Sequence, residues 1–505
     1  RCKAQFFGEQ RKAEAGAAMI AHLKLDVILR ILGLLLIVFS LTMLAPILVS
    51  LLYSDGEARS FFEALLIVLA VGMSVWYPLR RSQGDLRLRD GFLVVALFWC
   101  VIGLAGAVPF LVAEEPHMTI GEAVFESVSG FTTTGATVLT HLDALPPSIL
   151  YYRQQTQWLG GIGIVVLAVA LLPMLGIGGM QLLKAETPGP MKDTKLTPRI
   201  TGTAKALWIV YLVITACGYL AYRFAGMSSF DAICHAFAAV STGGFSTHDA
   251  SSGFFDSPLI EAITVALMVL GGASFALHFL AWRHRHLGDY WRDQELRAYL
   301  AVLLGTTVVT TLVLMTTADH AKASDAVRSA LFHAVSVQTS TGFTIEDFSK
   351  WPGVLPTLLI FTSFIGGCAG STAGGMKVIR WLLVAKQGNR ELSRLIHPNA
   401  TVVMKLGDKP VGPRVIEAVW GFFAAYLIAF TLLMLALMST GVDQITAFGA
   451  IASCMNNLGP GLGDVATNFA SVGTMGEWIC TLAMLLGRLE IFPLLVLVSP
   501  QFWRG

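Results

Sequence analysis

The chain has 505 residues, of which 55% are hydrophobic and only 13% are charged. Soluble domains carry roughly 25% charged residues, so this composition excludes an ordinary soluble protein. It predicts instead a chain that crosses a membrane many times. The formal net charge of +2 gives no support for a nucleic-acid partner, and we expect none.

Ten segments of the chain are long and apolar enough to span a membrane. Residues 1–18 are polar and mixed in charge, and we expect them to be added residues or upstream read-through before a natural start at Met19. A spanning helix needs about 20 apolar residues. The segments that meet this requirement are 26–52, 61–79, 91–113, 150–175, 204–224, 256–281, 297–317, 353–386, 412–440 and 473–499.

Four shorter, half-apolar segments lie between members of the last eight spans: 120–131, 229–240, 325–338 and 443–455. Each is too short to cross a bilayer, and each leads directly into a loop rich in glycine and hydroxyl groups. We therefore predict four re-entrant pore helices. Acidic residues stand at or just before their starts, where we expect ordinary helix-start preference rather than a role in ion entry: Glu122, Asp231, Asp325 and Asp443.

The four loops, which we call the filter loops, share one spacing. A leading residue in each pore helix is followed nine residues later by a glycine, and these pairs are Glu126 and Gly135, His235 and Gly244, His333 and Gly342, and Ala450 and Gly459. We call these four the key glycines. Non-helical backbone is tolerated at membrane depth only where protein buries it or where it lines a wet cavity. Four such loops predict one cation pore with pseudo-fourfold symmetry, whereas buried tight turns are the alternative.

Rings of backbone carbonyls can replace the water shell of a cation. We assign the ion ligands to backbone carbonyls, together with hydroxyls, of four triplets: Thr133-Thr134-Gly135, Thr242-Gly243-Gly244, Ser340-Thr341-Gly342 and Asn457-Leu458-Gly459. His235 and His333 occupy matching pore-helix positions. For these histidines we expect packing or a hydrogen bond to the filter backbone rather than catalysis.

A second unusual stretch interrupts the predicted span 353–386. It combines five glycines with two hydroxyl residues and ends in a lysine: Gly366, Gly367, Gly370, Ser371, Thr372, Gly374, Gly375 and Lys377. Such a sequence cannot form a stable helix that faces lipid. We predict a flexible loop below the filter that acts as a gate. Close helix packing through small residues is the alternative.

Two basic residues lie in or beside apolar segments. Arg488 stands deep in the last span, where a charge costs several kcal/mol unless it faces a cavity or a partner. It either lines the pore below the filter and opposes the cation, or pairs with Glu490 or backbone carbonyls for structure. Lys377 is either a second charge of this kind or an anchor that snorkels to the cytoplasmic surface.

Basic residues concentrate in alternate loops, at 80–90, 182–205, 282–297 and 386–414. Cytoplasmic loops carry an excess of lysine and arginine. We therefore predict that these loops and both termini are cytoplasmic, and that the filter loops open to the outside. Docking of a cytosolic partner is a further role that such loops could have.

These features give the chain a resemblance to a known family. The four filter segments (131–137, 240–246, 338–344 and 456–461) resemble those of the TrkH/TrkG/KtrB superfamily of potassium transport subunits. Two spans ahead of the first pore helix, together with the interruption at 366–377, resemble the TrkH-type branch. The resemblance covers about residues 19–504, which is nearly the whole chain.

The resemblance implies K⁺ as the transported ion and a homodimer with one pore per protomer in a bacterial inner membrane. It implies a cytosolic regulatory partner of TrkA type that binds NAD(H), ATP or ADP, so that no nucleotide is expected on this chain. It also places an arginine at the position of Arg488 near the gate, which favours the pore-lining interpretation.

The filter departs from the Thr-Val-Gly-Tyr-Gly pattern of tetrameric potassium channels. The key glycines are followed by Ala136, Phe245, Phe343 and Pro460. We therefore expect fewer ordered ion sites and weaker discrimination between K⁺ and Na⁺. A gated channel-like mechanism and coupled symport with Na⁺ or H⁺ both remain open, although no buried carboxylate relay stands out. A membrane enzyme or a receptor for a soluble protein would not explain four repeats, and we expect no enzymatic activity.

We therefore predict an all-α polytopic membrane protein. Four pseudo-repeated units of helix, pore helix, filter loop and helix surround one pore, and two extra transmembrane helices precede them. The predicted boundaries are 19–86 for the extra helices, then 87–200, 201–292, 293–405 and 406–505 for the four pore units.

Overall fold

The computed structural model describes residues 24–82, 84, 88–174, 200–317, 322–398, 403–407 and 409–504. Within these residues the chain is helical apart from loops and one small hairpin, in which β1 (Lys405–Leu406) pairs antiparallel with β2 (Lys409–Pro410). The predictions made for residues 1–18 and for most of the basic loop at 182–205 lie outside the described residues.

Two antiparallel membrane helices begin the described fold. α2 (Leu25–Thr42) runs through Met43 into α3 (Leu44–Tyr53), and together they form one apolar span that packs against α4 (Ala58–Leu79). α2 and α4 approach closely at Gly33 and Gly72, where a Cβ atom on either residue would lie 3.0 Å from the other's carbonyl oxygen. Small residues at a crossing are a common way to pack helices in a membrane.

The rest of the chain repeats one order of elements four times. The long opening helices are α5 (Leu88–Val112), α9 (Ile200–Phe224), α14 (Gln294–Thr316) and α18 (Pro413–Met438). The short helices are α6 (Ile120–Phe131), α10 (Ser229–Val240), α15 (Ala323–Gln338) and α19 (Gln444–Asn456). The closing helices are α7 (Pro147–Met174), α11 (Pro258–Gly272) with α12 (Phe275–His284), α16 (Leu355–Ile365) with α17 (Val378–Ile396), and α20 (Gly473–Arg488). The short helices match the predicted pore helices closely.

Small elements complete the fold. Single-turn 3₁₀ helices follow the filter loops: η1 (Leu142–Ala144), η2 (Ser251–Phe255), η3 (Phe348–Lys350), η4 (Gly463–Val465) and η5 (Ala470–Val472). Three further short helices are α13 (Gly288–Arg292), α21 (Phe492–Val498) and α22 (Pro500–Arg504).

Seven helices in the described residues are long and apolar enough to cross a membrane, or eight if the bent pair α11–α12 counts as one span. The predicted interruption of the span 353–386 is observed, because α16 ends at Ile365 and α17 begins at Val378. The prediction of one continuous span over 256–281 was wrong. α11 and α12 are bent by 95° where the backbone turns extended at Ala273 and Ser274.

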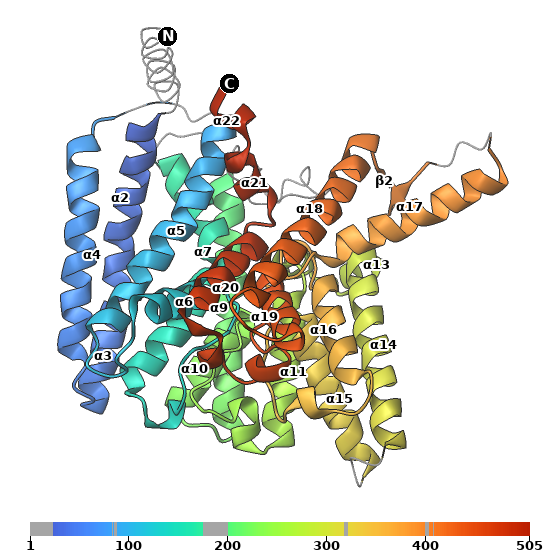
Figure 1. Cartoon of the computed structure of the whole chain (residues 1–505), viewed down its shortest axis with the longest axis horizontal. Helices are drawn as coiled ribbons and strands as arrows, with labels where there is room; N and C mark the ends of the chain where they lie inside the picture. The colour runs from blue at the N-terminus through green and yellow to red at the C-terminus, as the bar shows by residue number, and fades with distance from the viewer. Residues whose placement is uncertain are drawn as a thin grey trace.

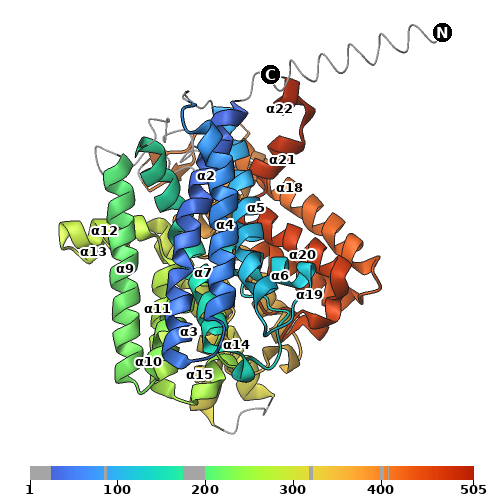
Figure 2. The same cartoon turned by 90° about the vertical axis from the view of Figure 1, so that its left-hand side faces the viewer.

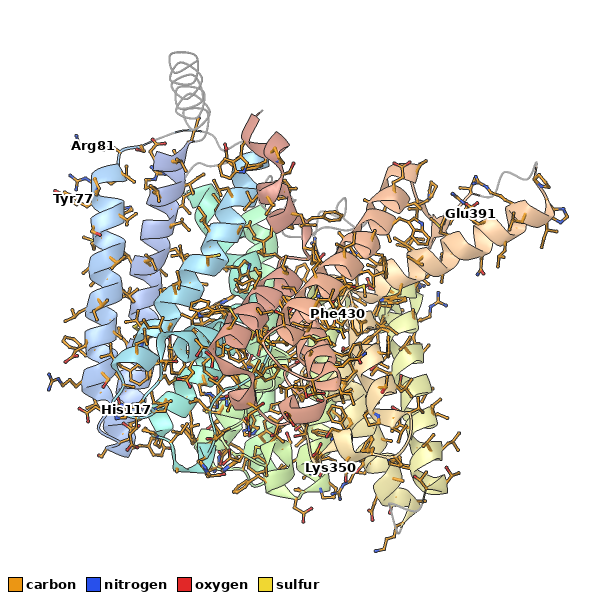
Figure 3. All side chains as sticks on the ribbon, in the orientation of Figure 1. Tyr77, Arg81, His117, Lys350, Glu391 and Phe430 are labelled. Atoms are coloured by element: carbon orange, nitrogen blue, oxygen red, sulfur yellow. The ribbon has the colours of Figure 1, made fainter. Side chains whose placement is uncertain are left out.

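The four short helices lie in the lower half of the molecule in Figure 1, between the long helices (Figures 1 and 2). All four are buried over most of their length, whereas α3, α9 and α18 expose large apolar side chains such as Leu52, Val213 and Leu427, as helices facing lipid do. α2 begins and α22 ends at the upper end in Figure 1. Figure 3 shows Arg81 and Glu391, which lie in or near two of the basic loops, toward that end, and Lys350 toward the opposite end.

Candidate functional site

The four filter loops lie against one another in cyclic order. A Cβ atom built on each key glycine would meet a carbonyl oxygen of the next loop: Gly135 meets Gly243, Gly244 meets Thr341, Gly342 meets Leu458, and Gly459 meets Thr134. All four approaches are closer than 3.0 Å, which real Cβ atoms essentially never show. Each key glycine therefore packs on the carbonyl that precedes the next key glycine, and the fourth loop closes the ring on the first.

The loops also share one backbone conformation. The residue two positions before each key glycine has a positive φ of 52° or 53°, and these residues are Thr133, Thr242, Ser340 and Asn457. The key glycines themselves have φ of 80°, 78°, 84° and 100° in chain order. Left-handed backbone at non-glycine residues is uncommon and collects at functional sites. Its recurrence at one position in all four loops brings the twelve predicted ligand residues into a single ring.

Hydrogen bonds to the pore helices hold this conformation. The amide nitrogen of the residue before each key glycine donates to a carbonyl in the last turn of its own helix. In chain order the four bonds are Thr134 to Ser129 (2.9 Å), Gly243 to Ala238 (2.8 Å), Thr341 to Ser336 (2.9 Å) and Leu458 to Ser453 (2.9 Å). The carbonyl ends of four helices thus point toward the ring, where their partial negative charge favours a cation.

Local sequence explains where the pore helices start. Thr119 and Glu122 form a reciprocal capping box at α6, and Ser228 caps α10 by accepting from the Asp231 amide. Asp443 accepts from two amides at the start of α19. Glu122 and Asp443 therefore cap helix starts, as predicted. Asp231 and Asp325 lie in the first turns of α10 and α15 and accept no backbone cap hydrogen bond there from the described residues.

The two pore-helix histidines bind the segments that leave the filter. His235 Nε2 lies 3.2 Å from Ser246 Oγ, and His333 Nε2 lies 3.1 Å from the Glu346 carbonyl oxygen. Both rings are buried, and Nδ1 of each lies 3.0 Å from a carbonyl oxygen in its own helix. Because a neutral imidazole carries one N–H, His333 donates to one of its two neighbouring carbonyls at a time. Both histidines are thus packed in the interior, and their Nε2 hydrogen-bond neighbours lie just after the filter triplets rather than in the filter backbone itself.

The 366–377 loop lies directly against the ends of the pore helices. Thr372 Oγ1 is 3.1 Å from the Val240 carbonyl oxygen at the end of α10. The Gly375 amide donates to the Asn456 carbonyl at the end of α19 (3.1 Å), and the Gly374 amide donates to Ser340 Oγ in the third filter loop. The loop therefore contacts three of the four units at the inner side of the ring.

The break between α11 and α12 supports the same loop. The Cys368 amide donates to the Gly272 carbonyl (2.8 Å), and the Phe275 amide donates to the Gly370 carbonyl (3.1 Å). In α14, Glu295 Oε1 accepts from the Ala369 amide at 2.6 Å. The loop predicted to be flexible is thus held by several backbone hydrogen bonds in this conformation.

Arg488 connects this loop to the first unit. Its guanidinium donates to the Thr372 carbonyl (3.1 Å), to the Gly160 carbonyl in α7 (3.0 Å) and to Thr133 Oγ1 (3.4 Å). Glu490, the other partner considered for it, pairs with Arg380. Arg488 thus lies under the ring and also contacts backbone carbonyls.

Lys377 is buried, with 9% of its surface exposed, and its ammonium donates to the Ala373 carbonyl within the loop. The interpretation of Lys377 as a snorkelling anchor was therefore wrong.

Sequence reasoning missed Arg153, which forms a fully buried ion pair with Glu126 behind the first filter loop. One signal could have found it. Glu126 is a carboxylate at a pore-helix position where the other units have histidine or alanine. A charge at that depth needs a partner.

A cavity of about 270 Å³ lies on the opposite side of the ring from the 366–377 loop. All four key glycines line it, together with the acidic residues Asp249, Glu346 and Asp347. Acidic side chains around such a mouth raise the local concentration of cations. The arrangement is that of a vestibule leading into a ring of carbonyls, and we call this cavity the outer cavity because the predicted topology places it on the outside.

His248 links two of the outer loops beside this cavity. Its imidazole pairs with Asp143 in η1 and lies 3.4 Å from Asp231 at the start of α10. Burial lowers the pKa of His248, but the hydrogen bonds to Asp231 and Asp143 outweigh this effect and raise it above the usual 6.5. Burial likewise raises the pKa of Asp143, but its hydrogen bonds to His248 and the Asp249 amide prevail and lower it below 3.8.

The raised pKa of His248 predicts a pH-dependent stability. Its contribution is fully present below the unfolded pKa of 6.5 and is lost as the pH rises through the higher folded value. We expect the melting temperature of the purified protein to fall more steeply than that of His248→Gln as the pH rises above 6.5. Parallel curves for the two proteins would show that this link does not contribute.

Comparisons with known proteins agree with this geometry. The family model TrkH, described as cation transport protein, matches residues 57–504. The Trk system potassium uptake protein TrkH of Escherichia coli (strain K12) is 53% identical over 477 residues, which cover 94% of this chain and 99% of that protein. TrkG of the same organism is 40% identical over 473 residues, covering 94% of this chain and 97% of that protein.

A solved structure is similar along the whole fold. The crystal structure of the potassium transporter TrkH from Vibrio parahaemolyticus matches with a TM-score of 0.87 and 50% sequence identity, covering 95% of this chain and all of that one. The chain therefore belongs to the TrkH family of cation transport proteins.

Proposed function

We propose that this chain is the membrane subunit of a Trk-type potassium uptake system and conducts K⁺ through the ring of filter loops. The observation that carries the proposal is the cyclic contact of four loops that share one left-handed backbone conformation. In this proposal the carbonyl oxygens at 133–135, 242–244, 340–342 and 457–459 replace the water shell of K⁺. The names of the relatives, which are potassium uptake proteins, support the choice of ion.

The proposal includes a gate on the inner side of the ring. The 366–377 loop closes the path below the filter, and the guanidinium of Arg488 opposes a cation that leaves it. The support is geometric, because the loop contacts the second, third and fourth units while Arg488 ties it to the first.

Removing the positive charge of Arg488 is expected to change the K⁺ flux. In Arg488→Gln we expect K⁺ flux to rise severalfold, since the cation then meets no fixed positive charge below the filter. Arg488→Lys keeps the charge and should stay near the natural flux. Arg285→Gln, at an exposed arginine of the α12–α13 connection, serves as the matched control. Equal flux in Arg488→Gln and the natural chain would leave Arg488 a purely structural role.

The system around the chain forms part of the same proposal. It consists of a homodimer in a bacterial inner membrane, with both termini in the cytoplasm, regulated by a cytosolic TrkA-type subunit that binds NAD(H), ATP or ADP. The support is the term "Trk system" in the names of the relatives, together with the position of Arg81 and Glu391, in or near two of the basic loops, toward the end where α2 begins and α22 ends.

One experiment tests the conduction proposal. The purified chain is reconstituted in liposomes with its regulatory subunit, and K⁺ flux is followed with and without gradients of Na⁺ and protons. We expect K⁺ to move down its own gradient with neither ion gradient present. A requirement for a Na⁺ or proton gradient would favour coupled symport. Absence of K⁺ flux under every condition would overturn the proposal.

A further inference from the structure

A buried ion pair lies behind the outer end of the first filter loop. Glu126 belongs to α6 and Arg153 to α7, and Arg153 Nε lies 2.7 Å from Glu126 Oε1. Both side chains are 0% exposed. Charges at such depth persist only when they pair and when further hydrogen bonds satisfy their remaining atoms. The hydrogen bonds of this pair therefore show which segments of the filter it supports.

The carboxylate of Glu126 holds the segment that leaves the first filter loop. Thr137 Oγ1 donates to it, with both carboxylate oxygens at 3.0 Å, and the Val138 amide donates to Oε2 at 3.2 Å. Thr137 follows the key glycine Gly135 by two positions. Glu126 thus fixes the outer exit of its own loop from behind.

The guanidinium of Arg153 extends this support to the second unit. Nη2 donates to Thr137 Oγ1 (3.0 Å), and Nη1 donates to the Ser246 carbonyl (3.2 Å). The guanidinium carbon also lies 4.2 Å from the centre of the Phe245 ring. Phe245 and Ser246 directly follow the key glycine Gly244. One side chain therefore joins the exits of two neighbouring filter loops.

The matching positions in the other units lack this bridge. His235 contacts the exit segment of its own loop and stacks on Phe343 at the exit of the third loop, with ring centroids 5.7 Å apart. His333 contacts the exit segment of its own loop, and the fourth unit has Ala450 there. Within the described residues, the first and second loops are thus the pair joined by a charged bridge behind the ring. Uncharged hydrogen bonds join other exits, such as the Thr344 amide of the third loop donating to Ser251 Oγ at 3.2 Å, so it is the charged reinforcement of the ring that lies on one side.

We propose that Glu126 and Arg153 are positioning residues that set the preference of the filter for K⁺ over Na⁺. The proposal rests on the conduction function proposed above. In the snug-fit account of selectivity, a carbonyl ring discriminates between these ions because it resists closing around the smaller one. By fixing the spacing between the exits of the first and second loops, the ion pair prevents this closure at the outer end of the filter.

The carboxylate of Glu126 also neutralises the charge of Arg153 beside the vestibule. Arg153 lines the outer cavity, and a guanidinium without its carboxylate would oppose entering cations. Glu126→Gln should therefore lower both the K⁺/Na⁺ flux ratio and the K⁺ flux itself. Arg153→Gln should lower the ratio without this additional electrostatic loss of K⁺ flux. A merely structural role predicts no such difference between the two variants.

The test measures K⁺ and Na⁺ fluxes separately in liposomes, together with the melting temperature of each protein. In Glu126→Gln and Arg153→Gln we expect the K⁺/Na⁺ ratio to fall by about tenfold, equivalent to about 1.4 kcal/mol. The double variant should be no less selective than either single variant, because both substitutions break the same pair.

A matched control is available in another ion pair. Glu261 of α11, which is 5% exposed, pairs with Arg328 of α15 at 3.0 Å, and neither residue lines the outer cavity. Glu261→Gln should lower the melting temperature while leaving the K⁺/Na⁺ ratio unchanged. Should the charge variants not fold, Thr137→Val removes the hydroxyl that joins both charges, and Thr137→Ser retains it. The valine variant should lose selectivity, and the serine variant should keep it.

An unchanged ratio in folded Glu126→Gln and Arg153→Gln, or in Thr137→Val where the charge variants do not fold, would overturn the inference. The proposed conduction would survive that result. A failure of the conduction proposal would give a different result, because the unaltered chain would then carry no K⁺ flux at all.

Discussion

Replacing Gly135 by valine is expected to reduce K⁺ flux through the reconstituted chain on the order of a hundredfold or more. Gly135 has a φ of 80°, where a β-branched side chain is strongly disfavoured. Its Cβ atom would also overlap the carbonyl oxygen of Gly243, which is one of the proposed ion ligands. The substitution must therefore displace the ring itself. Flux measured in liposomes on protein of confirmed fold gives the result.

Gly226→Val separates the effect on the ring from the effect of backbone strain. Gly226 has a φ of 101°, and no heavy atom lies within 4 Å of the place where its Cβ would stand. This control should therefore lower stability and leave K⁺ flux intact. Flux that persists in Gly135→Val would mean that the filter loops are not the path of the ion, and the proposed conduction mechanism would fail with it.

The pore helices could be predicted because their signals are local. Each lies in a short half-apolar segment, and Thr119, Ser228 and Asp443 supply hydrogen-bond acceptors at three of the helix starts. The left-handed backbone of the filter loops also follows from residues near in sequence, since each key glycine stands at a fixed distance from its pore helix. Repetition of these local signals four times was sufficient to predict the ring.

The bend between α11 and α12 could not be predicted in the same way. Residues 271–274 around it are small, and the adjacent glycines weaken a helix without showing whether it breaks or packs closely against a neighbour. The Gly272 carbonyl accepts a hydrogen bond from Cys368 in the 366–377 loop, almost a hundred residues later in the chain. Because the partner that stabilises the break is so distant in the sequence, the hydrophobic pattern of the segment itself does not show where the helix bends.

The partners of buried charges also could not be predicted from the sequence. Glu126 and Arg153 lie 27 residues apart on different helices, and nothing in one sequence shows that they meet. The sequence likewise left Lys377 open between a second charge near the gate and a snorkelling anchor. A lysine at the end of an apolar segment usually reaches the surface, but here the folded loop supplies the Ala373 carbonyl and buries the ammonium.

Shortening the 366–377 loop is expected to raise K⁺ flux on the order of tenfold. Removing Ser371, Thr372 and Ala373 eliminates the hydrogen bonds of Thr372 to the Val240 carbonyl and of Arg488 to the Thr372 carbonyl. The inner side of the ring then loses the element that covers it. The measurement is K⁺ flux in liposomes without the regulatory subunit, because a gate removed from the chain no longer needs that subunit to open it.

The ratio of K⁺ to Na⁺ flux distinguishes an opened gate from a damaged filter. The shortened loop leaves the key glycines and their pore helices in place, so the ratio should match that of the natural chain while both fluxes rise. A matched variant with Ser371 and Thr372 both replaced by alanine retains the loop length and should fall between the two proteins. If both variants carried the same K⁺ flux as the unaltered chain, the loop would only pack the helices together. The barrier to K⁺ would then have to lie elsewhere along the path.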